Sequence, residues 1–444
     1  MNIILLSGGS GKRLWPLSNN SRSKQFLKVL KDSDGRAESM VQRVYRQIQD
    51  SCPGAHVTVA TSVSQLDSIR SQLDEKVDVV TEPERRNTFP AIVLAAAYLY
   101  HKKKCSPDEP VIIMPVDPYT GRGYFETLSK MERAVRDGAA DIVLMGIDPT
   151  YPSEKYGYIV PDGQTAGGYT KVARFVEKPD LPSAKRLIDE GARWNGGVFA
   201  VRLGYIVETL QLGIADRSFE SIRAHYSDLA KNSFDYEVVE KAQSIAMIPY
   251  EGMWKDLGTW NTLSEEIGSD IGVVVRGKNT ENTQIINELD IPVVALGVKD
   301  MVIATSPDGI LVTGKEESSY IKPYVDDLDQ RPMYEERRWG TYKVIDYITY
   351  SDGRKSLTKH MQLVAGKKLS YQSHEKRDEI WTIVDGTGVL LLDGHTRNVK
   401  RGDVAYITAG MKHALCAVTD LHMIEVQIGQ ELIEEDITRY AMDW

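Results

Sequence analysis

The chain has 444 residues and a mass of 49.7 kDa, more than one ordinary hydrophobic core holds, so two or three domains are expected. Its net charge of −9 argues against nucleic acid or an anionic membrane as a partner. The longest apolar run, Pro90–Tyr100, is far shorter than the roughly 20 residues of a membrane span. The amino terminus does not resemble a secretory signal, and three scattered cysteines suit a reducing cytoplasm.

The first 268 residues alternate short apolar runs with stretches of helical character. Strands that are apolar on both faces and separated by helices indicate an α/β domain, 1–268, with a mostly parallel sheet covered on both sides. The expected strands are Asn2–Leu6, Val57–Thr61, Val77–Val80, Val111–Met114 and Ile142–Met145, and the expected helices are Glu38–Asp50, Val63–Leu73 and Pro90–Lys103.

The rest of the chain is rich in short β segments. Residues 269–328 carry apolar pieces roughly every 8–12 residues, a spacing that predicts a small antiparallel or coiled β subdomain. The polar stretch Lys322–Arg338 marks a domain boundary, unless it is a surface helix inside one continuous fold. Residues 329–444 contain many short strands punctuated by DG and GTG turns, which predicts an all-β barrel or sandwich.

The strongest local signal is the segment L-S-G-G-S-G-K-R-L-W-P-L, directly after the first expected strand. Its glycines let the backbone approach phosphate oxygens, and Lys12 and Arg13 supply cations. A Walker A loop is excluded because Leu6 and Arg13 stand where it needs Gly and Ser or Thr, and the dinucleotide fingerprint is incomplete. A Gly-rich turn can be purely structural, but Lys24 in S-K-Q-F-L adds a further cation downstream.

These residues resemble the start of the sugar-1-phosphate nucleotidyltransferases, most closely the bacterial mannose-1-phosphate guanylyltransferases. Further segments resemble motifs of that family in the same order: Glu82–Ala91, Met114–Asp117, Gly146–Ile159, Phe175–Pro179, Trp194–Phe199, Phe234–Lys241 and Trp254–Trp260. The resemblance implies a Rossmann-like, glycosyltransferase-A-like mixed sheet. It also implies Mg²⁺-dependent transfer of GMP from GTP to mannose-1-phosphate, which yields GDP-mannose and pyrophosphate.

The resemblance further implies roles for individual residues. Backbone N–H groups of the loop, with Arg13 and Lys24, hold the triphosphate and stabilise the leaving pyrophosphate. Asp117 and Asp256 ligate Mg²⁺, which favours carboxylate oxygens. The implied nucleotide-binding residues are Leu6, Gly8, Gly9, Ser10, Gly11, Lys12, Arg86 and Asn87, and the implied sugar-phosphate-binding residues are Gly157, Glu177, Lys178, Asn195 and Asp235.

Some of these residues have structural readings as well. Asp117 and Asp256 each stand where an Asp can simply form a turn, and Lys178 can be a solvated side chain. Two positions depart from the family pattern: Pro118 replaces a common His, and Gly196 replaces the Ser of W-N-S-G. The tryptophans are expected to pack around the site rather than to contact the substrate.

Five of the eight histidines fall in the last 106 residues, which suggests a metal site. The segments 366–386 and 402–413 resemble the two cupin motifs, with Gln372 at the first His position and Thr408 in place of Pro. Gln372, His374, Glu379 and His413 are the candidate ligands of Zn²⁺ or another divalent metal, because their N and O donors suit such ions. Lone histidines in a β core are otherwise structural.

Joined in this order, the two parts resemble bifunctional guanylyltransferases that carry a type II mannose-6-phosphate isomerase. That family implies a metal-assisted proton transfer between two sugar carbons, with Arg377 as its catalytic arginine. The family often reads Q-M-H-H-H-R, whereas Glu375 and Lys376 replace two of those histidines here. Isomerase activity therefore stays open at this point. A cytoplasmic homo-oligomer, most simply a dimer, is expected.

Three hypotheses follow. The first is a guanylyltransferase that makes GDP-mannose, with or without isomerase activity. The second is the same chemistry on another sugar phosphate or nucleotide, with a structural cupin domain. The third is a regulatory subunit that binds a sugar nucleotide without catalysis. The charged set, which comprises Arg13, Lys24, Asp117, Lys178 and Asp256, argues against the third because a pure binder has no need of two separate metal carboxylates.

Overall fold

The structure is a computed structural model that describes residues 1–9, 11–73, 77–210, 212–328 and 330–441. These residues form two compact units. The first comprises Met1–Leu14, Ser23–Leu66 and Gln72–Gly268, and the second comprises Trp15–Arg22, Asp67–Ser71 and Ser269–Trp444. Among the described residues, none of the helices combines the length and the apolar character needed to cross a membrane.

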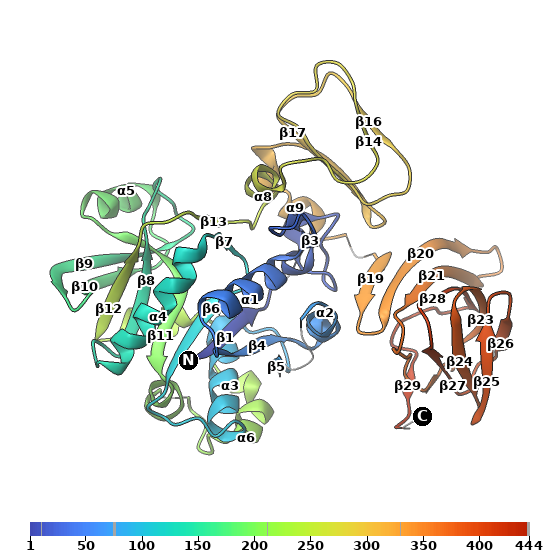
Figure 1. The fold of residues 1–444 in the computed structure, drawn as a ribbon, viewed down its shortest axis with the longest axis horizontal. Helices are drawn as coiled ribbons and strands as arrows, with labels where there is room; N and C mark the ends of the chain where they lie inside the picture. Colours follow the sequence, from blue (N-terminus) through green and yellow to red (C-terminus); the bar gives the residue numbers. More distant parts are fainter. Residues whose placement is uncertain (10, 74–76, 211, 329, 442–444) are drawn as a thin grey trace. The chain divides into compact units, whose positions relative to one another are not determined.

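The first unit is built on a sheet with the strand order β5-β4-β1-β6-β11-β8-β12-β10-β9 (Figure 1). Parallel pairing joins β5, β4, β1 and β6, and also joins β8 to β12, whereas β11 and β10 pair antiparallel with their neighbours. The sheet is therefore mixed, as the family resemblance implies, and the mostly parallel sheet predicted from strand patterning is wrong because β11, β10 and β9 pair antiparallel. The strands are β1 Asn2–Ser7, β4 His56–Ser62, β5 Asp78–Glu82, β6 Pro110–Pro115, β8 Ile142–Ile147, β9 Gly157–Ala166, β10 Tyr169–Val176, β11 Arg193–Arg202 and β12 Ile245–Tyr250.

Helices follow the predicted positions closely. Asn87 caps α3 by accepting a hydrogen bond from Thr88 N, and Ser39 and Gln42 form a capping box at α1. The helices are α1 Met40–Ser51, α2 Leu66–Gln72, α3 Thr88–His101, α4 Arg122–Arg136, α5 Leu181–Asp189, α6 Phe219–Ala224, α7 Phe234–Glu237 and α8 Trp260–Ile267, and the short two-stranded ladders are β2 Leu30–Lys31 with β3 Ala37–Glu38 and β7 Pro118–Thr120 with β13 Trp254–Asp256.

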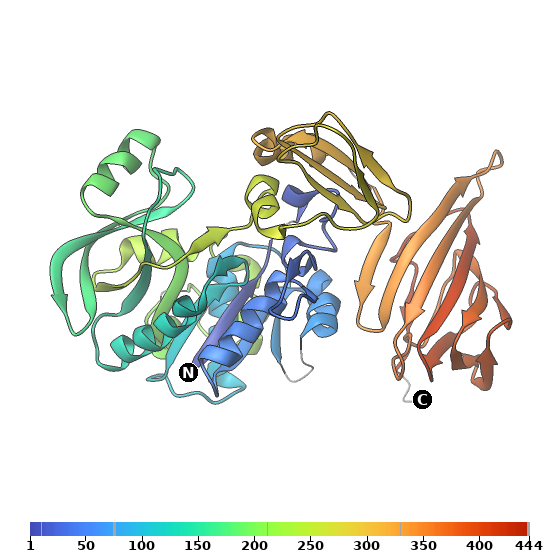
Figure 2. The same ribbon diagram turned by 45° about the horizontal axis from the view of Figure 1, so that its top comes forward.

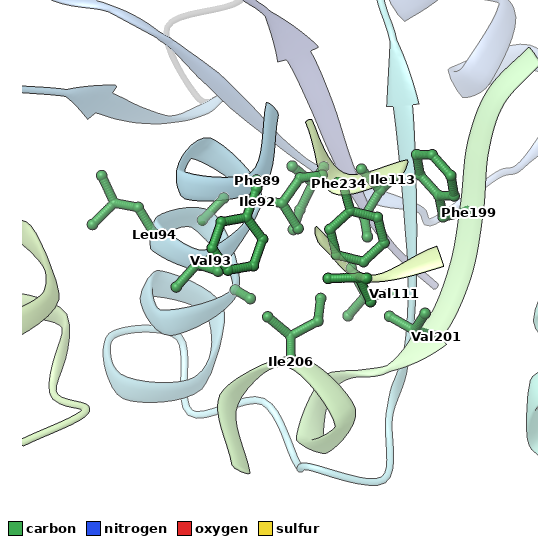
Figure 3. Close-up of a cluster of buried hydrophobic side chains, with 14 of the residues drawn as sticks. Phe89, Ile92, Val93, Leu94, Val111, Ile113, Phe199, Val201, Ile206 and Phe234 are labelled. Atoms are coloured by element: carbon green, nitrogen blue, oxygen red, sulfur yellow. The ribbon is translucent and has the colours of Figure 1, made fainter. Parts of the chain in front are cut away.

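Helix α3 is apolar nearly all round because it is buried in the core. Its Phe89, Ile92 and Val93 face Val111 and Ile113 of β6, together with Phe199 and Val201 of β11 (Figure 3). Ile3 and Leu5 of β1 are buried as well as Ile4, so both faces of the sheet are covered. This core fixes the strand ends from which the candidate site is built.

The second unit begins with a β coil. Strand β14 pairs parallel with β16, and β15 pairs parallel with β17, which also pairs antiparallel with β18. Paired residues of these parallel strands are about 18 residues apart in the sequence, so the chain winds in successive turns. Of the two predicted forms, antiparallel or coiled, the subdomain has the coiled one. The elements are β14 Val274–Arg276, β15 Gln284–Asn287, β16 Val293–Ala295, β17 Met301–Ser306, β18 Gly309–Gly314 and α9 Lys322–Val325.

The same unit ends in a β barrel of two sheets, drawn in orange to red in Figure 2. Their strand orders are β19-β20-β21-β28-β23-β26 and β25-β24-β27-β22-β29. The strands are β19 Tyr334–Arg337, β20 Gly340–Thr349, β21 Lys355–Leu363, β22 Gln372–Ser373, β23 Arg377–Asp385, β24 Thr387–Leu392, β25 His395–Lys400, β26 Val404–Ile407, β27 His413–Ala417, β28 Leu421–Gly429 and β29 Thr438–Arg439. An all-β barrel is as predicted. The division of this unit at residue 328 stays a prediction.

Candidate functional site

The glycine-rich loop leaves β1 and is held by buried polar side chains. Gly9 has a φ of 132°, a conformation that side chains rarely adopt, and its carbonyl accepts hydrogen bonds from Ser23 Oγ and Gln65 Nε2, each at 3.2 Å. Gln65 Nε2 also donates to Ser23 Oγ at 2.6 Å. These bonds place the loop beside Lys24, which opens a short helical turn, η2 Lys24–Phe26.

The Lys24 ammonium lies between the two predicted metal carboxylates. Its Nζ is 2.6 Å from Asp117 Oδ2 and 3.7 Å from Asp256 Oδ1. Asp117 follows β6, and the ladder of β7 with β13 sets Asp256 opposite Pro118, so residues far apart in the sequence converge. A Cβ on Gly258 would lie 2.9 Å from Asp256 Oδ1 and 3.3 Å from Lys24 Nζ, so only glycine leaves these groups undisturbed.

The charges of this group are interdependent. Burial alone would raise the pKa of Asp117, but the adjacent Lys24 ammonium outweighs it and lowers the pKa of Asp117. The pKa of Asp256 is raised, first by burial and then by the negative charge of Asp117, against the opposing effect of Lys24. Arg13 is exposed in η1 Lys12–Leu14 and lies near enough to stabilise both carboxylates electrostatically.

A cavity of about 440 Å³ adjoins Lys24 and Asp117. The predicted residues among its lining are Leu6, Gly8, Gly9, Lys24, Arg86, Asn87, Asp117 and Asp235. Arg86 also has structural partners, since its guanidinium donates to Leu229 O and pairs with Glu84, and Asn87 caps α3. Of the remaining predicted nucleotide residues, Gly11 is buried and Lys12 half-buried, whereas Ser10 lies outside the described residues.

Sequence reasoning missed Glu82, a buried carboxylate in the wall of this cavity. Its Oε2 accepts a hydrogen bond from Tyr226 OH at 2.7 Å, and its Oε1 would lie 3.7 Å from a Cβ on Gly8. Burial raises the pKa of Glu82. Its position at the end of β5, within the segment already singled out as Glu82–Ala91, was the available signal.

The predicted sugar-phosphate residues gather where β9, β10 and β11 adjoin. Gly157 pairs with Asn195, and a Cβ on Gly157 would lie 2.5 Å from Glu177 Oε2. Asn195 Nδ2 donates to Asp235 Oδ1 at 2.6 Å, which links this group to the cavity wall. Lys178 adopts a φ of 44° and its Nζ lies 2.7 Å from Glu177 Oε1. A non-glycine residue in this conformation is uncommon and often marks a functional position.

Two tryptophans stand beside this group. Trp194 and Trp254 have ring centroids 6.3 Å apart, with Tyr156 against both. Their Nε1 atoms are buried without a hydrogen-bond partner in the described part of the chain. A buried N–H without a partner is costly, so these groups are candidates to donate to a ligand.

The second unit carries a separate candidate metal centre inside the barrel. One ligand atom each of His374, Glu379 and His413 lie within 4.8 Å of one another, and all three residues are buried. Both imidazoles have a backbone carbonyl at Nδ1, Asp436 O at 2.6 Å and Met411 O at 2.9 Å, which leaves Nε2 to face the cluster. Gln372 Nε2 lies 3.4 Å from His374 Nε2, so all four predicted ligands converge.

Both imidazoles of this cluster are in a state that can donate a nitrogen lone pair to a metal. Burial lowers the pKa of His413 to about 4 and also lowers that of His374, so both rings stay neutral near pH 7. His413 Nε2 is buried without a hydrogen-bond partner among the described residues. Two neutral imidazoles and a carboxylate are a donor set that divalent transition metals accept, so the residues fit the metal that the sequence predicts.

Arg377 is part of the same cluster. Its Nε donates to Glu379 Oε1 at 2.9 Å, and its Nη2 lies 3.3 Å from His374 Nε2. The guanidinium supplies the positive charge that the buried carboxylate needs. Sequence reasoning missed the rest of the network, in which Trp381 Nε1 donates to both Glu379 and Glu425 at 3.1 Å. These carboxylates and Lys359 line a polar cavity of about 160 Å³.

The other histidines and the family departures lie outside the cluster. His360 and His422 stack on each other and His395 is exposed. The number of histidines in this part of the sequence is therefore larger than the number that could bind the metal. Glu375 and Lys376, which replace family histidines, are exposed, and their backbone N–H groups donate to the Asp436 carboxylate. The departures therefore leave the buried donor set intact.

Comparison with known families agrees with this division. The family model described as nucleotidyl transferase matches residues 2–270, and the model described as the C-terminal part of mannose-6-phosphate isomerase matches residues 327–442. The fold and the first site thus define a nucleotidyltransferase, to which a segment of isomerase type is joined.

Relatives extend the likeness to nearly the whole chain. The chain is 30% identical to the mannose-1-phosphate guanylyltransferase of Escherichia coli K12, covering 99% of this chain and 97% of the relative. It is 31% identical to the xanthan biosynthesis protein XanB of Xanthomonas campestris, covering 98% and 97%. A solved structure described as mannose-1-phosphate geranyltransferase from Thermus thermophilus matches with a TM-score of 0.62 and 29% identity, covering 74% of this chain and 99% of that one. The chain belongs to the nucleotidyl transferase family and, within it, to the mannose-1-phosphate guanylyltransferases with an isomerase-type C-terminal segment.

We predict that the cluster in the barrel binds a divalent metal and that this binding does not affect the first site. Replacing His374 by Ala removes one nitrogen donor and should lower the bound divalent metal well below the ~1 equivalent expected for a closed N and O donor set. Metal content of the purified protein, measured by mass spectrometry, checks this, with exposed His395→Ala as the matched control. The nucleotidyl-transfer rate should not change. Stoichiometric metal retained in His374→Ala would contradict the assignment.

Proposed function

We propose that the chain transfers GMP from GTP to mannose-1-phosphate and so makes GDP-mannose and pyrophosphate. The observation that carries the proposal is the cavity that Gly8, Gly9, Lys24, Asp117 and Glu82 line together. It offers a phosphate loop, a cation, a metal carboxylate and an acceptor for the base in one place. The name of the relative from E. coli, mannose-1-phosphate guanylyltransferase, supports the sugar nucleotide as product.

At the phosphate end, the reaction needs charge neutralisation more than covalent chemistry. The sugar phosphate oxygen attacks the α-phosphorus in line, and pyrophosphate leaves with its negative charge. Backbone N–H groups from Gly8 to Gly11, which include Ser10, together with Lys12, Arg13 and Lys24 are proposed to hold that charge throughout. Catalysis then rests on positioning, because correctly placed reactants avoid the entropic cost of meeting in solution.

Asp117 and Asp256 are proposed to hold Mg²⁺ in this site. Their carboxylates are the donors that Mg²⁺ takes, and Lys24 now supplies the compensating charge between them. When bound, the metal would neutralise phosphate charge during the transfer. Burial and the nearby charge of Asp117 raise the pKa of Asp256, and the positive charge of a divalent ion would oppose both effects.

Glu82 is proposed to read the guanine base. Guanine presents two adjacent N–H donors on its Watson–Crick edge, and a carboxylate can accept both, whereas adenine presents one donor and one acceptor there. Tyr226 fixes one carboxylate oxygen of Glu82 and so orients the group toward the cavity. Arg86 and Asn87, next along the chain, are proposed to support this end of the nucleotide.

On the sugar side, Lys178 is proposed to bind the sugar phosphate. Glu177, Asn195 and Asp235 are proposed to bind its hydroxyl groups, and Gly157 gives Glu177 room. Gly196 stands where the family has Ser, and a Cβ there would lie 3.7 Å from Trp254 Nε1. With that hydroxyl missing, the Trp254 N–H is left to donate to the sugar.

The barrel is proposed to be an isomerase that interconverts mannose-6-phosphate and fructose-6-phosphate with a divalent ion, Zn²⁺ or another, bound to Gln372, His374, Glu379 and His413. The observation that favours it is the outward position of Glu375 and Lys376, which spares the buried donor set. The bound metal would polarise the sugar oxygens. Arg377 would orient the substrate oxygens beside Glu379. A cytoplasmic homodimer completes the proposal.

A substrate panel tests the transferase proposal. Pyrophosphate release is measured with Mg²⁺ and GTP, ATP, CTP or UTP, each against mannose-1-phosphate and glucose-1-phosphate. Turnover confined to GTP with mannose-1-phosphate is expected, because Glu82 pairs with guanine. Turnover with another pair would keep the mechanism but change the substrate. If folded protein releases no pyrophosphate with any pair, catalysis is contradicted and a regulatory subunit that binds a sugar nucleotide is the remaining hypothesis.

Glu82→Gln tests the base assignment. The Gln amide has one acceptor and one donor, which match adenine, but its NH2 group would face one of the two guanine N–H donors. We therefore expect kcat/KM for GTP to fall ~10-fold to ~100-fold and kcat/KM for ATP to rise. Steady-state kinetics with both nucleotides give the ratio. Tyr226→Phe is the matched control, since it keeps the carboxylate and should weaken GTP use without favouring ATP. An unchanged GTP to ATP ratio in Glu82→Gln would remove Glu82 from base recognition.

A further inference from the structure

The segment Trp15–Arg22, here called the strap, belongs to the second unit although it lies between two residues of the first site. Arg13 precedes it and Lys24 follows it, and both of these belong to the first unit. The chain therefore leaves the first unit immediately after one proposed phosphate-binding cation and returns immediately before the next. What holds the strap bears directly on where these two cations can be.

An ion pair fixes the carboxyl end of the strap. Arg22 binds the Glu288 carboxylate with both Nη atoms, at 2.7 and 2.9 Å, and its guanidinium lies 5.0 Å from the centre of the Tyr334 ring. The two side chains are only 15% and 23% exposed. A two-point Arg–carboxylate contact with little exposure fixes orientation as well as distance. Glu288 follows β15 of the coil directly.

A buried aspartate fixes the middle of the strap. Asn19 Nδ2 donates to Asp308 Oδ2 at 2.7 Å, and Asp308 Oδ1 accepts from Met333 N at 2.6 Å. Asn19 Oδ1 meanwhile accepts from the backbone N–H groups of Ser21 and Arg22, at 2.8 and 2.7 Å. Asp308 thus sets the turn that leads to Arg22.

The amino end of the strap is fixed by packing. A Cβ on Gly309 would lie 2.4 Å from Trp15 Cζ2, so the indole packs against a position that only glycine allows. Ser306 Oγ donates to Pro16 O at 2.7 Å. The strap is therefore held at both ends and in its middle, by Glu288 after β15, by residues 306–309 where β17 turns into β18, and by Tyr334 of β19.

We propose that Glu288 and Asp308 are positioning residues for nucleotidyl transfer, acting through the strap on Arg13 and Lys24. Arg22 is separated from Lys24 by Ser23 alone, and Trp15 from Arg13 by Leu14 alone, so few backbone torsions can absorb a displacement of the strap. A misplacement of about 1 Å can cost ~100-fold in rate. The inference rests on the proposed transferase function for its kinetic readout, but not for its exchange readout.

The experiment compares Glu288→Gln and Asp308→Asn with Glu281→Gln, in the full chain. Glu281 lies on the same coil in an exposed pair with Lys299, so its variant controls for charge removal. Backbone amide exchange is followed in residues 11–14 and 23–27 and in β15 and β17. Transfer is measured with the nucleotide and sugar phosphate that the parent protein uses best. Glu288→Asp tests rescue, because it keeps the charge.

The proposal predicts faster exchange in residues 11–14 and 23–27 with unchanged exchange in β15 and β17. It also predicts that kcat/KM for the nucleotide falls ~10-fold to ~100-fold, that KM for the sugar phosphate is unchanged, and that Glu288→Asp recovers part of the loss. Unchanged exchange in the flanking residues would overturn it, as would a uniform loss that includes the coil strands. If the parent protein is inactive with every pair of nucleotide and sugar phosphate, the proposed function is refuted. The exchange result still decides whether Glu288 and Asp308 hold the residues on either side of the strap.

Discussion

The first site depends on one arrangement, an ammonium group held between two carboxylates that are partly removed from water. Lys24 reaches Asp117 at 2.6 Å and Asp256 at 3.7 Å, and its positive charge opposes the repulsion between the two carboxylates. The rest of the unit serves to bring these three residues together. The core around α3 fixes the end of β6, the β7–β13 ladder brings in Asp256, and buried Ser23 and Gln65 hold the loop before Lys24.

The barrel also places a buried carboxylate beside a cation, but with different residues. Glu379 is buried and its pKa is raised, chiefly by that burial, and Arg377 provides the nearby positive charge. The neighbouring Glu425 has its pKa raised to about 7, first by burial and then by the charge of Glu379. In each site a buried carboxylate beside a second one has a raised pKa, and the positive charge of a divalent ion would oppose that effect.

Much of this could be predicted from the sequence, for physical reasons. Buried strands and the glycine loop have local signatures, and the spacing of Gln372, His374 and Glu379 along β22 and β23 brings their donors together. The antiparallel course of β11 could not be predicted by patterning, because a strand that is buried on both faces looks the same in either direction. Likewise, no local spacing shows that Asp117 and Asp256 meet, since that depends on a ladder between distant strands. Glu82 was missed because its burial in the cavity wall and its hydrogen bond with Tyr226, 144 residues away, depend on the tertiary fold.

The central claim is that the Lys24 ammonium offsets part of the negative charge of Asp117 and Asp256, in the place where a divalent ion would otherwise be attracted. Mn²⁺ is a direct probe, because its binding can be followed by electron paramagnetic resonance without any nucleotide. Replacing Lys24 by Met removes the internal cation and keeps the shape of the side chain, so Mn²⁺ affinity should rise by at least ~10-fold relative to the parent protein. Equal or weaker Mn²⁺ binding by Lys24→Met would contradict the account.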